Sequence, residues 1–275
     1  MIVRFARLVA GFLRGRDLNL HAAAVTFYAG VAVVPVALLV MRVASAVAGP
    51  GRVRHLAGPV IDAMPARMAA GAGVLVSAGL AMSWWLTLVA LVPATLYGEG
   101  LRRALASLSG VAGAATAGWR GRLLVLPLLA VGPVLLLIML AALAWPARLL
   151  RTGGWTAVGS VVLSFLVVWL VLSPVLILVY RLIAPVSPGW AATAAVGSFT
   201  AANLAGFAHG FVLFWSLPLN LGAPFGGLEG VGAAVAVGLW LYLFHVLTLL
   251  GYAATIQVHR MLLLRREPEA GNHPK

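Results

Sequence analysis

The stretch from His21 to Val40, HAAAVTFYAGVAVVPVALLV, contains no acidic side chain, no lysine and no arginine. Spanning the hydrocarbon core of a bilayer takes about 20 mostly apolar residues in a helix. This stretch is therefore long enough and apolar enough to cross a membrane. A helix would also satisfy its backbone polar groups internally, which the interior of a bilayer requires.

The composition of the whole chain agrees with that first stretch. Of its 275 residues, 63% are hydrophobic and only 9% are charged. Soluble domains have about a quarter of charged residues, and the six acidic residues of this chain cannot supply such a surface. Cysteine is absent, which excludes disulfides, thiolate catalysis and cysteine-ligated metal.

Further stretches of similar length and hydropathy follow, separated by short connections. We therefore predict an all-α, polytopic membrane helical bundle with about six transmembrane helices, forming one domain over residues 1–266. Residues 267–275 are polar and include Pro268 and Pro274, and we predict that they form a disordered cytoplasmic tail. The predicted spans are Ala22–Ala48, Ala69–Leu96, Leu123–Trp145, Trp155–Ile183, Trp190–Leu217 and Gly227–Ile256.

The basic residues are distributed unequally between the two sides of this bundle. The N-terminal segment, the second and fourth connections and the C-terminal tail together carry 13 basic residues, against 5 on the other side. Cytoplasmic segments of membrane proteins are enriched in lysine and arginine. The count therefore predicts that both termini lie in the cytoplasm, together with a helix over residues 99–119.

The net charge of +13 would suggest nucleic acid in a soluble protein, but here the arginines lie between apolar stretches. We therefore expect anionic lipid headgroups as partners and no nucleic acid. In the first fifteen residues, Arg4, Arg7 and Arg14 fall on one helical face and apolar side chains on the other. This pattern predicts an N-terminal interfacial amphipathic helix that contacts headgroups; the alternative is a solvated arm.

Five segments, taken in order, resemble the YihY/BrkB family of bacterial inner-membrane proteins, and the similarity runs from about Phe12 to Arg260. The segments combine an Ala-rich first span containing Phe-Tyr and Pro with a Tyr-Arg at the end of span four and a Gly-Gly-Leu entry to the last span. They are HAAAVTFYAGVAVVPVALLV (21–40), LYGEGLRRAL (96–105), GWRGRLLVLPLL (118–129), LVYRLIAP (178–185) and FGGLEGVGAAVAVGLWLYLFHVLTLLGYAAT (225–255).

The resemblance implies six spans, cytoplasmic termini and a place in the inner membrane. Members of the family have been linked to serum resistance and to lipid or lipopolysaccharide transport, and an older ribonuclease name is regarded as mistaken. The chain departs from the family pattern at Ala253, where many relatives have a glutamate. Any role of that carboxylate in relatives does not carry over to this chain.

Polar residues inside or beside membrane spans are costly and are therefore candidate sites. Glu99 precedes Arg102 and Arg103 by three and four positions, which puts the carboxylate and the guanidinium groups on one helical face. The group is either an interfacial ion pair that orients the connecting helix or a contact for a headgroup or substrate.

Glu229 lies in the glycine-rich entry to the last span, next to a connection without basic residues. It is either an exposed acid on the outer face or a buried carboxylate that binds a cation or exchanges a proton, since transporters build sites at such interrupted helices.

In span five, Asn203, Gly206 and Gly210 share one face, and Gly206 and Gly210 form a G-x-x-x-G pattern typical of close helix packing. The Asn203 amide would then bridge helices; the alternative is a polar strip along a substrate path. His209 is a further candidate for substrate or ion binding, although a lone histidine such as His209 or His245 is more often a packing residue.

Three classes of function fit the pattern unequally. The first is a transporter or a protein that handles lipids or envelope components, and the second is a membrane scaffold or assembly factor. An enzyme comes third, because no catalytic residue set, metal site or cofactor motif is apparent. Homo-oligomers and envelope-protein partners are left open.

Overall fold

The computed structural model describes residues 2–110, 119–150 and 153–270, with side-chain surroundings given within residues 7–264. All secondary structure in these residues is helical, and they contain no strand. The predicted fold class, an all-α membrane helical bundle, is confirmed. The helices are α1 (Ile2–Leu13), α2 (Leu18–Ala48), α3 (Pro50–Asp62), α4 (Ala66–Ala81), α5 (Trp84–Ser109), α6 (Trp119–Leu124), α7 (Leu126–Leu150), α8 (Gly154–Leu178), the π-helix η1 (Val179–Ile183), α9 (Trp190–Ser216), the 3₁₀-helix η2 (Ala223–Phe225) and α10 (Glu229–Ala270).

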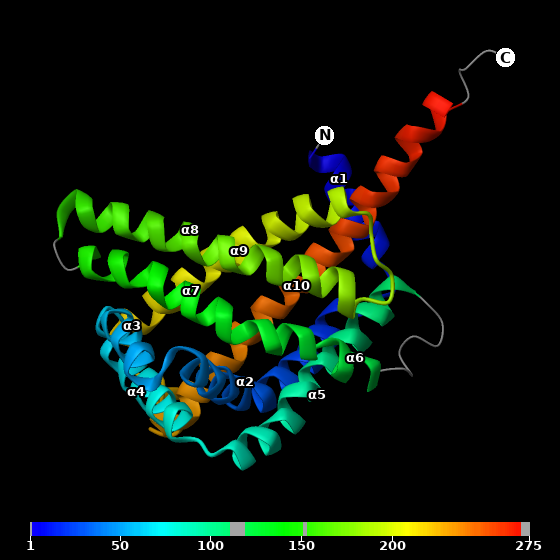
Figure 1. Ribbon diagram of the computed structural model, residues 1–275. Coiled ribbons are helices and arrows are strands. Elements are labelled where there is room, and N and C mark those ends of the chain that lie inside the picture. The colour runs from blue at the N-terminus through cyan, green and yellow to red at the C-terminus, as the bar shows by residue number, and fades with distance from the viewer. Residues whose placement is uncertain (1, 111–118, 151–152, 271–275) are drawn as a thin grey trace.

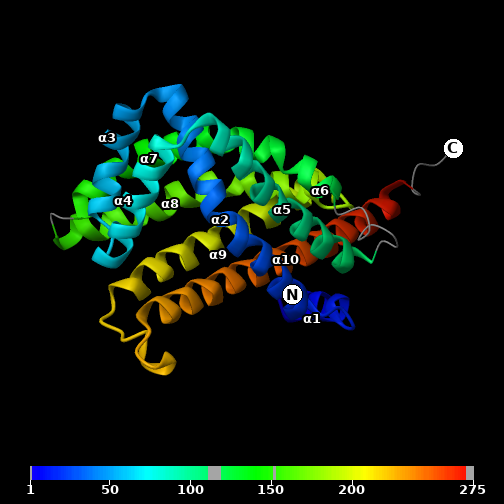
Figure 2. The same ribbon diagram turned by 90° about the horizontal axis from the view of Figure 1, so that it is seen from below.

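Five helical segments among the described residues are long and apolar enough to cross a bilayer: α2, α6 with α7, α8 with η1, α9, and α10. They form a closed ring, in which α2 contacts α10, α10 contacts α9, α9 contacts α8, α8 contacts α7, and α7 contacts α2. Figures 1 and 2 show α10 running along the whole molecule beside α2 and α9. The count of six spans stays a prediction.

The second predicted span, Ala69–Leu96, is not one helix. It is divided between α4 and α5 by Met82 and Ser83, whose backbone is extended. The Ser83 hydroxyl accepts a hydrogen bond from the Leu86 amide at 3.3 Å and so caps the first turn of α5. The sequence did not indicate this boundary because neither proline nor glycine stands at the break. The serine there is not a clear signal, since serine is common both inside spans and at helix N-termini.

Several boundaries differ from the predicted ones. α5 continues to Ser109 without interruption, so the predicted connecting helix is the end of α5, and residues 111–118 lie outside the described residues. α10 runs to Ala270. The predicted disordered tail, 267–275, therefore begins inside α10, and its last residues, 271–275, are outside the description.

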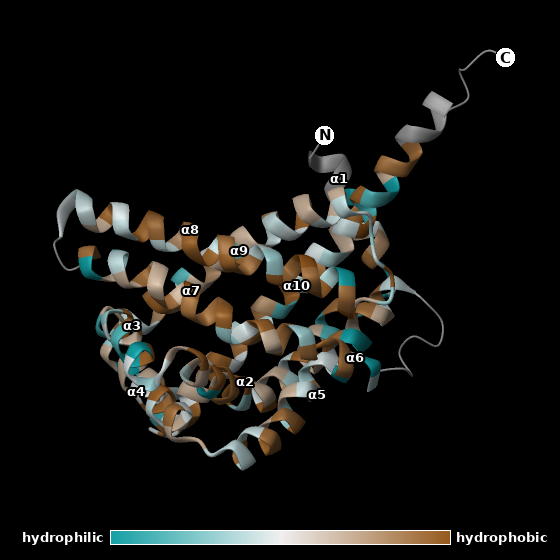
Figure 3. Cartoon of the chain, in the orientation of Figure 1, coloured by the Kyte–Doolittle hydropathy of each residue, from teal (hydrophilic) through white to brown (hydrophobic). Residues whose placement is uncertain are grey.

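The main core lies at one end of the ring. It is formed by the C-terminal half of α5, the start of α2, η1 and the second half of α10, and its fully buried members include Leu105, Tyr180 and Tyr252. The N-terminal helix α1 packs on α10 beside this core. Figure 1 shows both ends of the chain on this side, and Figure 3 shows hydrophilic residues gathered there and again around α3. We call the end of the bundle that contains the main core, the C-terminal half of α5, α6 and η1 the basic end. We call the end that contains α3 and α4 the hollow end.

Candidate functional site

The basic end is organised around one buried carboxylate, Glu99. Its side chain is only 9% exposed and forms ion pairs with Arg103, four residues later on α5, and with Arg122 of α6, whose Nε lies 2.5 Å from Glu99 Oε2. The predicted pair with Arg103 is confirmed. Arg122 joins from another helix, so Glu99 ties α5 to α6 in addition to pairing along its own helix.

Arg102 does not pair with Glu99. Its guanidinium is buried and donates one hydrogen bond from Nη1 to the Ile183 carbonyl, at 2.6 Å. That carbonyl is the last of the π-helix η1, where the wider turn leaves backbone oxygens without an α-helical partner. Arg102 thus fastens the end of η1 to α5.

Two tyrosines lock the neighbouring helices together. Tyr180 of η1 donates from its hydroxyl to the Thr248 carbonyl of α10 at 2.6 Å, and Tyr252 of α10 donates to the Val186 carbonyl at 2.9 Å. Ala253, beside Tyr252, is fully buried in the same packed region. These contacts hold η1, the connection to α9, and α10 in one arrangement.

Close helix approach occurs at the basic end and not at the predicted glycine pair. A Cβ built on Gly98 would lie 2.7 Å from Val125 Cβ and nearer still to the Gly121 carbonyl oxygen, so α5 and α6 touch through their backbones. A Cβ on Gly206 would meet only Phe165 at 3.9 Å, and one on Gly210 would meet Trp240 at 3.4 Å. These are ordinary contacts, so the prediction of close packing at the G-x-x-x-G pattern is wrong.

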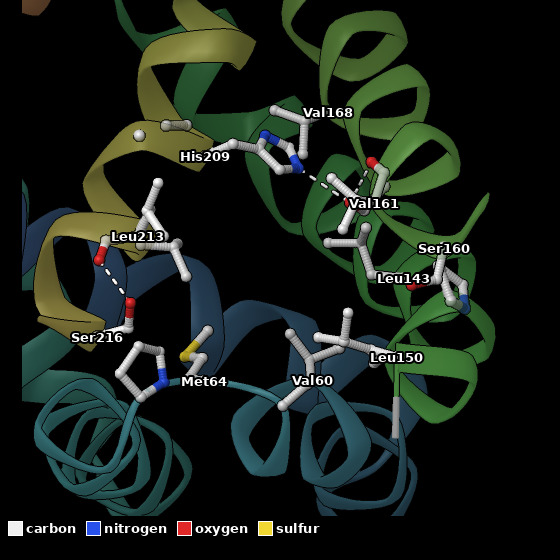
Figure 4. A pocket seen from close by; sticks show the side chains of 18 residues that line it. Val60, Met64, Leu143, Leu150, Ser160, Val161, Val168, His209, Leu213 and Ser216 are labelled. Carbon is white, nitrogen blue, oxygen red and sulfur yellow. Dashed lines mark hydrogen bonds between the residues drawn. The ribbon is translucent and has the colours of Figure 1, made fainter. Parts of the chain in front are cut away.

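An open cavity of about 750 Å³ lies at the hollow end, between α3, α7, α8, α9 and the connection after α3 (Figure 4). It is lined mostly by apolar side chains, and its polar side chains come from three serines and one histidine. The lining residues are Val60, Ala63, Met64, Pro65, Leu143, Pro146, Ala147, Leu150, Ser160, Val161, Ser164, Val168, Ala208, His209, Gly210, Val212, Leu213 and Ser216.

The polar side chains of this cavity already have partners. Ser160 and Ser216 each donate to a carbonyl of their own helix, at 2.7 and 2.6 Å. His209 has Nε2 2.9 Å from the Ser164 hydroxyl and Nδ1 2.8 Å from the Ala205 carbonyl. Its Nδ1 must carry a proton to bond that carbonyl, so in the neutral ring Nε2 can only accept. The Ser164 hydroxyl then donates either to this nitrogen or to the Val161 carbonyl of its own helix, at 2.8 Å. The walls therefore suit an apolar occupant.

His209 is thus placed at a cavity, as the sequence suggested, but its predicted companions are not. Asn203 is exposed and donates from Nδ2 to the Phe199 carbonyl of its own helix at 2.8 Å, so it does not bridge helices as predicted. Glu229 is exposed in the first turn of α10. The structure therefore favours the exposed acid over the buried carboxylate at this position.

His245 lies among three helices in the bundle. Its ring nitrogens are 3.2 Å from the Thr26 hydroxyl and 3.3 Å from the Tyr97 hydroxyl, and the side chain is buried. This agrees with the interpretation of His245 as a packing residue with satisfied hydrogen bonds. Within the described residues, no three histidine, aspartate or glutamate side chains come together as a metal-ligand set.

The predicted N-terminal helix is present as α1. Arg7 and Arg14 are exposed, whereas Val9 and Phe12 on the other face are half-buried; the side chain of Arg4 lies outside the described ones. The Arg260 guanidinium lies over the Phe12 ring, 5.4 Å from its centroid. The face predicted to contact headgroups is therefore free of the bundle at two of its three arginines.

Two partners were not predicted from the sequence: Arg122 as a partner of Glu99, and Ser164 as a partner of His209. These pairs are 23 and 45 residues apart, and each joins two helices, so no helical spacing could reveal them. The cavity between α3, α7, α8 and α9 was not predicted from the sequence either. The short helix α3, which closes it, was not predicted.

Of three comparisons with known proteins, one gives a match. No curated protein and no solved structure matches the chain significantly. A family model described as Virulence factor BrkB matches residues 10–274, which is nearly the whole chain. Together with the ring of apolar helices and the resemblance noted in the sequence, this match shows that the chain belongs to the BrkB family of membrane proteins, also called the YihY/BrkB family.

Proposed function

We propose that the protein handles a lipid or another amphiphilic component of the bacterial envelope, and that it holds an acyl chain of this component in the cavity at the hollow end. The observation that supports this proposal is the cavity itself. Its volume, about 750 Å³, lies within the range of roughly 300–1,000 Å³ typical of small-ligand sites. Because the cavity lies among apolar helices, the acyl chain of a lipid in the bilayer would have a short path to the cavity.

The chemistry of the walls argues for an acyl chain over an ion or a sugar. A polar solute entering a membrane protein must exchange its hydration for hydrogen bonds with the walls. Here the serines and His209 already use their hydrogen-bonding groups on one another or on their own helices. An acyl chain needs no such partners and gains dispersion contacts with leucine, valine and proline side chains.

Photocross-linking tests this proposal directly. The purified full-length protein, reconstituted in bilayers, is incubated with phosphatidylethanolamine that carries a diazirine in one acyl chain. We expect cross-links after irradiation at lining residues such as Met64 and Leu213, located by mass spectrometry. Ala208→Phe should fill the cavity and reduce these cross-links to background, because a phenyl ring would occupy the space between α8 and α9.

A matched control separates this effect from a general change in the bilayer-facing surface. Ala141 is exposed on α7 and does not line the cavity, so Ala141→Phe should leave the cross-links unchanged. Equal labelling of the wild-type protein and Ala208→Phe at Met64 and Leu213 would exclude the cavity as an acyl-chain site.

The runner-up function is a membrane scaffold or assembly factor without transport activity. It is favoured by the basic end, where the helices are fully packed and several arginines remain on the surface. In that case the cavity would be an inert packing defect, and diazirine lipids would label the outer faces of the bundle without preference. The proposal places the protein in the bacterial inner membrane, with no catalytic step and no cofactor.

A further inference from the structure

The basic end holds more positive charge than its acidic side chain can balance. Four arginines come together from α5 and α6: Arg102, Arg103, Arg120 and Arg122. Glu99 forms ion pairs with two of them, Arg103 and Arg122. In the described part of the chain, no acidic side chain pairs with Arg102 or Arg120. The cluster therefore has an excess of two unpaired guanidinium groups.

Arg102 is also short of hydrogen-bond partners. A guanidinium has five N–H donors, but the described residues accept only one hydrogen bond from Arg102, at the Ile183 carbonyl. Its Nε is buried without a partner, and the residue as a whole is only 9% exposed. An arginine removed from water and left with unused donors is costly unless another acceptor approaches it.

Arg120 belongs to the same place. It directly precedes Gly121, whose position is in close contact with the Arg102 side chain: a Cβ built on Gly121 would lie 2.9 Å from Arg102 Cβ. Arg102 lies beyond the apolar part of α5, and burial there lowers the pKa of its guanidinium, with the positive charge of Arg120 lowering it further. Arg120 is exposed, and its guanidinium carbon lies 5.8 Å from the centroid of the Trp119 ring.

We infer that Arg102 and Arg120 bind a phosphate group at the basic end of the bundle, with Glu99 holding Arg122 and Arg103 beside it. A phosphodiester headgroup offers one negative charge shared over two acceptor oxygens, and free phosphate or a monoester offers up to two charges over three or more oxygens. Either form can accept hydrogen bonds from the guanidinium groups of two neighbouring arginines. It would supply acceptors to the unused donors of Arg102 and balance the charge of Arg120. The phosphate belongs either to a lipid headgroup or to a free phosphate compound.

This site is separate from the cavity of the proposed function. The cavity is lined by α3, α7, α8 and α9, whereas the arginines lie on α5 and α6, at the opposite end of the ring. Filling the cavity through Ala208→Phe should therefore leave phosphate binding unchanged. Loss of acyl-chain labelling and loss of phosphate binding are thus distinguishable outcomes.

The test uses the full-length protein in detergent, titrated with phosphatidylglycerol and with phosphatidylcholine and followed by native mass spectrometry. We expect preferential binding of the anionic lipid to the wild-type protein. Arg120→Gln should weaken that binding about tenfold, the loss of one charge-assisted interaction. Because the Arg120 side chain is exposed, this variant should keep the melting temperature of the wild type.

Arg102→Lys provides the second variant. It keeps the positive charge and a donor for the Ile183 carbonyl but removes the planar fork, and we expect a similar loss of phosphatidylglycerol binding. The matched control is Arg54→Gln, an exposed arginine on α3, which should bind lipid as the wild type does. Unchanged binding in both Arg102→Lys and Arg120→Gln would overturn the inference, as would an equal loss in Arg54→Gln.

Inorganic phosphate distinguishes the two sources. Calorimetric titration of the wild-type protein with inorganic phosphate should show binding that Arg120→Gln weakens if the site accepts free phosphate compounds. If inorganic phosphate neither binds nor displaces phosphatidylglycerol, while Arg120→Gln still weakens lipid binding, the site binds a phosphate only as part of a lipid headgroup. Either result supports a phosphate site at Arg102 and Arg120.

Discussion

At the end of the bundle that carries both termini, side chains from α5, η1 and α10 fill the space between the helices, and an ion-pair group joins α5 to α6. At the other end, α3, α7, α8 and α9 surround a cavity of about 750 Å³. The same ring of helices is thus tightly packed on one side and open on the other.

The two ends also differ in how polar groups are used. At the basic end, Glu99, Arg102 and Tyr180 make hydrogen bonds or ion pairs between different helices. At the hollow end, the serines bond mainly to their own helices. His209 and Ser164 connect α9 with α8, and Arg67 of α4 donates to the Leu219 carbonyl at 3.1 Å. Polar contacts between helices are therefore concentrated at the basic end, and five experiments test the differences between the two ends.

The largest effect is all-or-none and concerns topology. We expect reporter fusions made after Arg54 and after Arg151 to lie outside the cytoplasm, and fusions at both termini to lie inside it, because basic segments are retained in the cytoplasm. A phosphatase reporter paired with a fluorescent reporter measures this. Phosphatase activity at the termini together with fluorescence at Arg54 and Arg151 would place the basic end outside the cytoplasm.

Truncation of a leucine should cost far more at the basic end than at the cavity. Leu105 is fully buried and Leu213 is 65% exposed. We expect Leu105→Ala to lower the free energy of unfolding by about 3 kcal/mol, because it leaves a void in a packed region. Leu213→Ala should cost less than about 1 kcal/mol, because it only enlarges an existing space.

Unfolding in a mixture of mild detergent and dodecyl sulfate, followed by circular dichroism, gives both values. Equal losses in the two variants would show that the ends are packed alike.

Glycine substitutions give the next largest difference. Gly98→Ala would push a methyl group against the Gly121 carbonyl and Val125, and we expect a loss of about 2 kcal/mol from overpacking. Gly206→Ala has room for its methyl group, and alanine is the better helix former, so stability should stay equal or rise by up to about 1 kcal/mol. Melting temperatures in detergent compare the two, and a larger loss in Gly206→Ala would restore the predicted role of the G-x-x-x-G pattern.

Glu99 and Glu229 allow the loss of a buried carboxylate to be compared with the loss of an exposed one. Glu99→Gln removes the buried partner of Arg103 and Arg122, and we expect about 2 kcal/mol of destabilisation. This is below the roughly 3–5 kcal/mol expected for fully buried pairs, because both arginines are nearly half exposed.

Glu229→Gln, at an exposed position, should change neither stability nor lipid labelling. Should Glu229→Gln abolish a function that Glu99→Gln preserves, the interpretation of Glu229 as an ordinary exposed acid would be wrong.

The smallest effect concerns α1. Replacement of Arg4, Arg7 and Arg14 by glutamine should weaken binding of the peptide 1–16 to vesicles containing phosphatidylglycerol by about 1 kcal/mol for each arginine removed. Added salt should weaken the wild-type peptide in the same direction. Flotation with labelled peptide measures both, and salt-independent binding would argue for the solvated-arm alternative.

Much of the architecture follows from the sequence. The runs Trp155–Ile183 and Trp190–Leu217 match α8 with η1 and α9 within one residue at each end, because long apolar helices are specified locally by hydropathy and by their flanking tryptophans and glycines. The pair of Glu99 and Arg103 was also predictable, since a spacing of four residues on a helix fixes which side chains meet.

The break at Met82 and Ser83 was not predictable in the same way. Residues 69–96 contain no charged side chain, and hydropathy alone does not distinguish one long helix from two helices that meet at an angle. The break depends on α4 packing against α2, where the Gly79 position lies against Met41. It therefore depends on contacts between distant parts of the chain.

The sequence by itself determined that this chain is a membrane-embedded helical bundle of the BrkB family, because hydropathy is a property of local segments; the gathering of its basic residues on the cytoplasmic side stays a prediction. Only the tertiary structure decided that Arg122 reaches Glu99, that Arg102 is buried with unused donors, and that a cavity lies beside His209. Each of these depends on how helices far apart in sequence meet. Residue spacing predicts which side chains meet on one helix, but it does not predict which apolar helix surfaces pack against each other.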